Sequence, residues 1–330
     1  MGTRRGLNRS IRRDRSVWRS RFMLMSVLAA GLLLFGGATA FAMVDKLWTS
    51  GGHDLENTRN QDKTKISAEN AADLEVAWIL NVGEDVSATP AVDKDSVYFP
   101  DWAGHLYRAD RETGEVIWSK SVADYTGISG NFSRTTPALY DGGLIFGDQG
   151  GRIGEGARVM SVDADTGNLR WSTSVGNHPS AIVTQSATVS KGVVYVGVSS
   201  FEESFAAFPN YPCCSFRGSM LAIDASTGNI LWETTMVPTT GASPDYSGNA
   251  IWGSNPVIDT KRRAVYVTTG NNYSIPDLVA EPPRVLWRLH QYERGWSPWD
   301  DREDIQSSFG RGRCGLFTSG GMPVTGLMAV

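Results

Sequence analysis

Cysteine and histidine are scarce in this chain of 330 residues, which has three cysteines and four histidines. Three cysteines are too few for a disulfide-dense scaffold. The histidines are scattered without the spacing of metal ligands, and no CxxCH sequence is present to attach a haem. A GxSxG elbow, a P-loop and a dinucleotide fingerprint are also missing. These absences exclude the commonest hydrolase, nucleotide-binding and haem-binding classes.

Basic residues are sparse outside the first 22 positions. Those positions hold 8 of the 31 lysines and arginines and one of the 35 acidic residues, so the remainder has 23 basic and 34 acidic residues and a net charge of −11. An acidic body without a basic stripe predicts no nucleic-acid partner.

The basic start runs into an uncharged, mostly apolar segment, residues 23–42, which ends in small residues with Ala-x-Ala spacing. This order is typical of a signal peptide. A run of about 20 apolar residues also suffices to span a bilayer. We therefore expect residues 1–42 to be a signal peptide or an N-terminal membrane anchor. In either case the body is exported, and is periplasmic or anchored facing the periplasm.

A repeat runs through the body, with the pattern Asp-x-x-Thr-Gly-x-x-x-Trp. Its three copies lie in residues 106–118, 159–171 and 220–232, and a degenerate earlier copy ends at Trp78. Each copy predicts a hairpin in which the Asp side chain and a glycine with positive φ form the turn. The second strand then ends at a tryptophan, and we expect Trp118, Trp171 and Trp232 to pack between neighbouring units.

A second kind of hairpin lies between the copies, in residues 89–99, 136–146, 186–197 and 255–267. Each has a short turn followed by alternating β-branched and aromatic residues. Two hairpins make a four-stranded unit of about 40–60 residues, and repetition of such units predicts an all-β fold, a β-propeller.

These repeats resemble the tryptophan-docking motif of the quinoprotein dehydrogenases. Longer stretches, SATPAVDKDSVYFPDWAGHLYRAD, NYPCCSFRGSMLAIDASTG and YSGNAIWGSNPVID, resemble polyvinyl-alcohol dehydrogenase-like members over about residues 48–277. The resemblance implies an eight-bladed propeller that binds pyrroloquinoline quinone (PQQ) and Ca²⁺. It also implies oxidation of a secondary alcohol, with electrons passing to a separate cytochrome c.

The resemblance also implies a metal site. In the family a Gly-x-Ser-x-x-Glu strand supplies a calcium ligand and a hydroxyl that touches the quinone, which here are Glu202 and Ser199. A second ligand comes from a Thr-Gly-Asn sequence, here ending at Asn271. Carboxylate and amide oxygens suit a hard cation. A solvated loop glutamate and an ordinary turn asparagine are the alternatives, and Glu203 is a neighbouring competitor.

Three further residues match cofactor-binding positions of the family. Trp252 would lie against one face of the quinone, Thr184 would hydrogen-bond it, and Arg134 would pair with its oxygens. A planar guanidinium suits that last role. A surface ion pair is the alternative for Arg134.

Two of the three cysteines, Cys213 and Cys214, are adjacent. In the best-known alcohol dehydrogenases of the family such a pair forms a disulfide over the quinone, just before the arginine that matches Arg134. Here the pair lies one repeat later, before Arg217. We expect a Cys213–Cys214 disulfide that caps the cofactor face.

The resemblance stops near Asp277. Residues 278–330 contain six arginines, no lysine and no docking repeat, and they offer no match to the aspartate that is the family's general base. We interpret residues 43–277 as about four of eight blades and residues 278–330 as a foreign or frame-shifted tail, with a divergent natural end as the alternative. The open sheet edges of such a half-propeller predict self-association.

A non-catalytic propeller that binds proteins, such as an outer-membrane assembly scaffold, is the competing function. It would not need Glu202, Asn271 or Trp252.

Overall fold

The computed structural model describes residues 47–61, 64–150, 155–176, 178–237, 246–275 and 327–329. All of them lie in one compact unit, Lys46–Val330. The expected leader, residues 1–42, and most of the tail, including Cys314, lie outside the described residues. No helix within the described ranges is long and apolar enough to cross a membrane.

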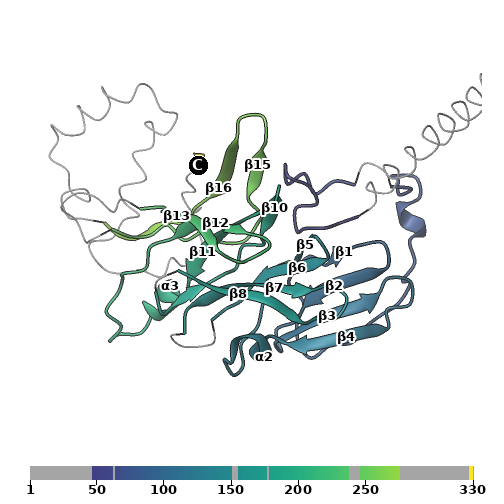
Figure 1. Cartoon of the computed structure of the whole chain (residues 1–330), viewed down its shortest axis with the longest axis horizontal. Helices are drawn as coiled ribbons and strands as arrows, with labels where there is room; N and C mark the ends of the chain where they lie inside the picture. The colour runs from purple at the N-terminus through teal and green to yellow at the C-terminus, as the bar shows by residue number, and fades with distance from the viewer. Residues whose placement is uncertain are drawn as a thin grey trace, which may run out of the picture. The chain divides into compact units, whose positions relative to one another are not determined.

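The predicted four-stranded units are present as antiparallel sheets whose strands follow chain order (Figure 1). The first sheet contains β1 (Ala91–Val92), β2 (Ser96–Pro100), β3 (His105–Asp110) and β4 (Val116–Ser121). The second contains β5 (Ala138–Tyr140), β6 (Gly143–Gly147), β7 (Ala157–Asp163) and β8 (Leu169–Val175). The third contains β10 (Thr188–Ser190), β11 (Val193–Ser200), β12 (Ser219–Asp224) and β13 (Ile230–Thr235), with β9 (Ala181–Ile182) also paired to β11.

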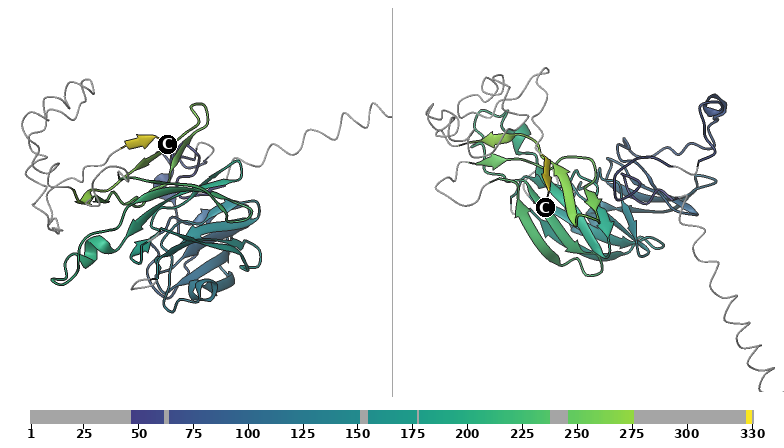
Figure 2. Two further views of the ribbon diagram at one scale, coloured as in Figure 1. Left: turned by 60° about the vertical axis from the view of Figure 1, so that its left-hand side comes forward. Right: turned by 90° about the horizontal axis from the view of Figure 1, so that it is seen from above.

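A fourth sheet contains β15 (Val257–Asp259), β16 (Ala264–Thr268) and β18 (Leu327–Ala329), beside a separate pair, β14 (Ser247–Gly248) and β17 (Asn272–Ser274). The short strand β18 comes from the atypical tail, yet it pairs antiparallel with β16 (Figure 2). It takes the third place in its sheet, as β12 does beside β11. Within the part of the chain that the structure describes, three short helices occur in the connections: η2 (Ala71–Asp73), α2 (Val122–Thr126) and α3 (Glu202–Phe205).

The Asp-x-x-Thr-Gly turns form as predicted. One carboxylate oxygen of Asp110 accepts hydrogen bonds from the backbone N–H groups of Glu112 and Thr113 and from the Thr113 hydroxyl. Asp163 and Asp224 repeat this pattern. The glycine that follows has a φ of 74° at Gly114, which side chains rarely adopt.

Each docking tryptophan packs against the next sheet along the chain. The Nε1–H groups of Trp78, Trp118 and Trp171 donate to the carbonyl oxygens of Arg111, Ala164 and Ala225, at 3.0, 3.1 and 2.9 Å. The indole rings lie so close to the turn glycines that a Cβ on Gly228 would stand 2.8 Å from the ring of Trp171. Trp232 packs against a cluster that includes Met220 and Val265, from the third and fourth sheets. The predicted packing between blades is confirmed.

In each of the four sheets other than the β14–β17 pair, an acid or an amide follows the second strand within three residues. Asp101 follows β2, Asp148 follows β6, Glu202 follows β11 and Asn271 follows β16. The three acids are fully buried. Because the second strands occupy equivalent places in the repeated sheets, these four side chains mark one recurring position of the fold, and the candidate site includes two of them.

Candidate functional site

The acids of the first two sheets hold loops in place. Asp101 accepts hydrogen bonds from the backbone N–H groups of Gly83 and His105. Asp148 accepts from the side-chain amide of Asn131 at 2.7 Å and from the backbone N–H of Arg158 at 2.6 Å. Burial raises the pKa of Asp148 to about 6, because the loss of hydration outweighs these hydrogen bonds.

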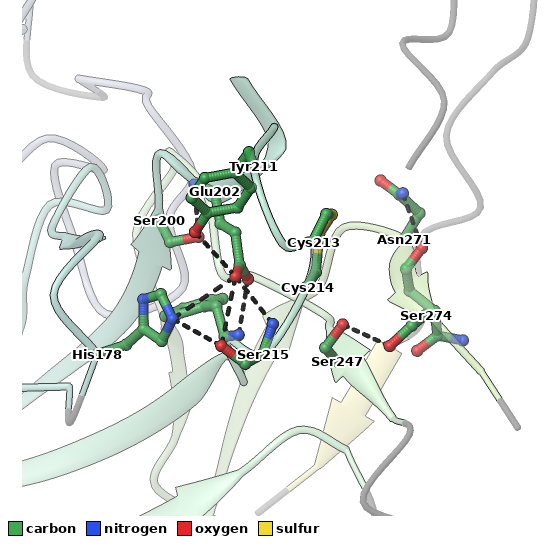
Figure 3. The surroundings of a disulfide bond; sticks show 12 residues. His178, Ser200, Glu202, Tyr211, Cys213, Cys214, Ser215, Ser247, Asn271 and Ser274 are labelled. Carbon is green, nitrogen blue, oxygen red and sulfur yellow. Dashed lines mark hydrogen bonds and ion pairs between the residues drawn. A yellow bond between two sulfur atoms is a disulfide. The ribbon is translucent and has the colours of Figure 1, made fainter. Parts of the chain in front are cut away.

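Glu202 holds a longer loop (Figure 3). Its Oε1 accepts hydrogen bonds from the Tyr211 hydroxyl at 3.1 Å and from the backbone N–H of Ser215 at 2.8 Å. Its Oε2 accepts from the backbone N–H of Phe216 at 2.7 Å. The carboxylate at the start of α3 therefore binds the chain 13 and 14 residues later, and it closes residues 203–214 into a loop.

His178 lies against the same carboxylate. Its Nδ1 accepts a hydrogen bond from the backbone N–H of Ser180, which places the proton of the neutral ring on Nε2. Nε2 lies 3.1 Å from the Ser215 hydroxyl and 3.6 Å from Oε1 of Glu202. Burial lowers the pKa of His178, and the negative charge of Glu202 opposes this only in part. At neutral pH the imidazole is therefore neutral, and its Nε2–H donates to the Ser215 hydroxyl beside the carboxylate.

Cys213 and Cys214 lie within the closed loop, and in the structure their side chains are joined as a disulfide. Figure 3 shows the pair between Glu202 on one side and Asn271 on the other. The state of the two thiols in the isolated protein stays a prediction.

The hydroxyl groups of Thr184 and Ser199 meet in the third sheet. They lie 3.0 Å apart, and the Ser199 hydroxyl also lies 3.3 Å from the carbonyl oxygen of Ile182. Both residues are buried, and the pairing of β9 with β11 brings them together. The structure thus places these two cofactor candidates beside each other, and Ser199 lies three residues before Glu202 in the chain.

Trp252, Gly270 and Asn271 form a second group. A Cβ on Gly270 would stand 2.9 Å from Nε1 of Trp252, so only glycine leaves room for the indole there. The backbone N–H of Gly270 donates to the carbonyl of Ala250 at 2.8 Å, and the backbone carbonyl of Asn271 accepts from Asn249. The side-chain amide of Asn271 donates to the carbonyl of Asn272, which leaves its side-chain oxygen as the atom that a cation would meet.

Arg134 lies on the connection between α2 and β5. Its guanidinium stacks over the ring of Trp102, 5.4 Å from the ring centroid, and Trp102 donates its Nε1–H to the Ser87 hydroxyl at 2.8 Å. Sequence reasoning missed Trp102. The available signal was an aromatic residue directly after a strand-end aspartate, Asp101.

The groups around Glu202 have the chemistry of a hard-cation site. Among the described residues no lysine or arginine forms an ion pair with Glu202, and the neutral His178 beside it brings no positive charge. The oxygen atoms of Glu202 and Asn271 are of the type that Ca²⁺ prefers. No group of three or more His, Cys, Asp or Glu side chains that could hold a metal ion gathers within the described ranges, so Glu202 and Asn271 remain candidates. The flat ring of Trp252 and the paired hydroxyls likewise suit a planar, polar cofactor.

The repeated antiparallel sheets, their docking tryptophans and this polar cluster define a β-propeller of the PQQ-repeat class. A protein-family model described as "Outer membrane protein assembly factor BamB" matches residues 10–212 and, in a second overlapping match, residues 158–305. The chain belongs to this PQQ-repeat family, and it is similar to the quinoprotein alcohol dehydrogenases.

The similarity to the quinoprotein alcohol dehydrogenases rests on named relatives. A polyvinylalcohol dehydrogenase from a Pseudomonas species is 30% identical over 242 residues, which cover 69% of this chain and 36% of the relative. A quinohemoprotein alcohol dehydrogenase from Comamonas testosteroni is 26% identical over 298 residues, 77% of this chain and 40% of the relative. A crystal structure of the Comamonas testosteroni enzyme matches with a TM-score of 0.55 and 24% identity, over 71% of this chain and 36% of that one, and supports the fold.

The chain spans only about a third to two fifths of the length of these relatives. The activity, substrates and partners of the whole proteins are therefore proposals for this chain.

Proposed function

We propose that this chain carries the PQQ-facing part of a dehydrogenase that oxidises a secondary alcohol, as a polyvinyl-alcohol dehydrogenase does. The observation that supports the proposal is that the Thr184 and Ser199 hydroxyls lie 3.0 Å apart, and that Trp252 lies against Gly270, next to Asn271. These residues occur in a chain that is 30% identical to a named polyvinylalcohol dehydrogenase.

When bound, PQQ supplies the electron acceptor for alcohol oxidation. The face of Trp252 orients the flat cofactor, and the hydroxyls of Thr184 and Ser199 bind its polar edge. Glu202 and Asn271 hold Ca²⁺ through their oxygen atoms. Arg134, kept planar against Trp102, pairs with cofactor oxygens. The disulfide of the closed loop caps this face.

The proposal extends to location and partners. The basic, apolar and small-residue order of residues 1–42 directs the body to the periplasm, free or anchored. Its electrons pass to a separate cytochrome c, as the resemblance to the quinoprotein dehydrogenases implies.

A scaffold function is the second candidate, because the matching family model takes its description from an outer-membrane assembly factor. Such a scaffold would bind a protein partner and would tolerate loss of Glu202, Trp252 and Asn271.

Reconstitution separates the two candidates. The folded chain is supplied with PQQ and Ca²⁺, and dye reduction is followed with a secondary alcohol. Alcohol-dependent reduction that Glu202→Gln lowers at least tenfold supports the dehydrogenase. The scaffold is supported if the folded chain neither binds the cofactor nor reduces the dye. It is supported further if a protein partner still binds to variants at Glu202, Trp252 and Asn271.

A further inference from the structure

A strap formed by residues 48–59 ties three of the sheets together. Its backbone forms hydrogen bonds with the first strands of the first, second and fourth sheets, β1, β5 and β15. These contacts pair Trp48 with Val92, Thr49 with Leu139 and Leu55 with Ile258, at 2.7 to 3.0 Å. Within the strap, the backbone N–H of Arg59 donates to the carbonyl of Gly52 at 3.1 Å and closes a short loop. The strap is therefore a fixed platform for its own side chains.

Asn57 reaches from the strap to the chain directly after Trp252. Its Nδ2 donates to the Ser254 hydroxyl and to the backbone carbonyl of Asn255, both at 3.2 Å. Nη2 of Arg59 donates to the same Ser254 hydroxyl at 3.3 Å. These hydrogen bonds join positions 195 to 198 residues apart in the chain. The turn that carries Trp252 is therefore bonded to the strap.

The turn formed by residues 252–255 has little else to hold its middle. Ser254 has a φ of 70°, in the left-handed region that a residue with a side chain rarely adopts. Gly253 lies in open space, because no atom stands within 4 Å of a Cβ built on it. A strained residue and an unpacked one therefore follow Trp252 directly, and Asn57 bonds the strained one in place.

The amide of Asn57 is held in one orientation. A Cβ on Gly52 would collide with its Oδ1, so the backbone of the strap lies directly against that atom. The carbonyl of Asn255 can only accept, which requires the Nδ2 end to face the turn. Oδ1 is buried and accepts no hydrogen bond within the described part of the chain. A buried acceptor without a partner lowers stability, so stability alone does not account for asparagine at this position.

We propose that Asn57 is a positioning residue for Trp252, because it fixes the turn of residues 252–255 and with it the direction of the indole face. The inference rests on the proposed function, in which that face orients the flat cofactor. Asn57 does not touch the cofactor and acts only through Trp252. Without its hydrogen bonds the indole would have to be ordered when the cofactor binds, which lowers the affinity.

The test is a double-mutant cycle on PQQ binding to the full chain with Ca²⁺, measured by isothermal titration calorimetry. Asn57→Gly removes the amide and suits the φ of 58° at this position. It should weaken binding by about tenfold, as the loss of one or two hydrogen bonds does. In the Trp252→Ala background the same substitution should change the affinity by less than about twofold, because the residue that Asn57 positions is gone.

Asn70→Gly is the matched control. The side chain of Asn70 also takes part in two hydrogen bonds, with the backbone of Ser67 and of Lys65, at 2.7 and 2.8 Å. Both are local, so Asn70→Gly should bind PQQ as the wild-type chain does. Equal affinity of Asn57→Gly and wild type overturns the proposal, as does a loss from Asn57→Gly that is the same with and without Trp252.

A measurement without cofactor separates this inference from the proposed function. Near-ultraviolet circular dichroism of the cofactor-free chain reports the fixed packing of its aromatic rings. Asn57→Gly should reduce this signal in the wild-type background and leave it unchanged in the Trp252→Phe background. An equal reduction in both backgrounds overturns the inference.

Failure of the wild-type chain to bind PQQ contradicts the proposed function, and the cofactor-free measurement then decides the role of Asn57. If far-ultraviolet circular dichroism shows that Asn57→Gly is unfolded, Asn57→Asp replaces it with the same expected results. The aspartate keeps the shape of the side chain, but its carboxylate cannot donate to the carbonyl of Asn255.

Discussion

The carboxylate of Glu202 accepts a hydrogen bond from the backbone N–H of Phe216, at 2.7 Å across 14 residues of chain. Glu202 is the candidate metal ligand. Through this contact and those to Ser215 and Tyr211, it also holds the loop that carries the cysteine pair. The candidate metal ligand and the loop that carries the cysteine pair are therefore coupled at Glu202.

Removal of that carboxylate should destabilise the chain. Glu202→Ala leaves the buried N–H of Phe216 and that of Ser215 without an acceptor, which costs about 2–4 kcal/mol of unfolding free energy. Glu202→Gln keeps one acceptor oxygen and should cost less. Urea denaturation measures both changes, and limited proteolysis should cut within residues 203–214 in the alanine variant first. Glu233→Ala, at an exposed position of β13, is the control and should behave as wild type.

The docking turns predict that alanine destabilises the protein more at Gly228 than at Gly130, although the two glycines have similar φ. Gly228 and Gly130 have φ values of 76° and 70°, so alanine is strained at both. At Gly228 a Cβ would also stand 2.7 Å from the Thr173 hydroxyl and 2.8 Å from the ring of Trp171, whereas nothing lies within 4 Å at Gly130. Gly228→Ala should therefore cost about 1–3 kcal/mol more than Gly130→Ala. Equal losses in thermal unfolding would show that the tryptophan does not dock there.

The buried Asp148 predicts a pH dependence. Its pKa is about 6 in the folded protein against an ordinary value of 3.8, so the folded state retains a proton that the unfolded chain releases. Its contribution to stability is fully present below pH 3.8 and is lost as the pH rises through 6. The free energy of unfolding of Asp148→Asn, relative to that of wild type, should therefore rise by about 3 kcal/mol between pH 3.5 and pH 7. Parallel stability curves for the two proteins over this range would contradict the assignment.

The cysteine pair gives a direct chemical prediction. Alkylation of the unfolded, unreduced protein should leave Cys213 and Cys214 unmodified, and reduction should add two alkyl groups to the peptide that contains them. Mass spectrometry of that peptide measures this, with Cys314 in a separate peptide as the internal control. Alkylation of both Cys213 and Cys214 before reduction would contradict the disulfide.

The repeats made the fold predictable from the sequence. Asp110, Thr113 and Gly114 encode a turn through hydrogen bonds that act within four residues, and such local chemistry can be read along the chain. The tryptophans were predictable for the same reason, because each recurs at a fixed distance from its turn.

The site was predictable only in part, because its contacts join distant residues. The hydrogen bonds from Tyr211, Ser215 and Phe216 to Glu202 cross an insertion, and no repeat marks their ends. His178 looked like one of four scattered histidines until the fold brought it to that carboxylate. The pairing of β18 with β16 was missed as well, since only three residues of an otherwise unlike segment carry it.

The central claim is that this chain binds PQQ at the face formed by Trp252 and the Thr184–Ser199 pair. The most direct measurement is a titration of the folded chain with PQQ in the presence of Ca²⁺, followed by quenching of tryptophan fluorescence. The account predicts saturable binding with one PQQ per chain, weakened at least tenfold by Trp252→Ala and left unchanged by Leu231→Ser. Absence of saturable binding to the folded chain, or equal affinity of Trp252→Ala and wild type, would contradict it.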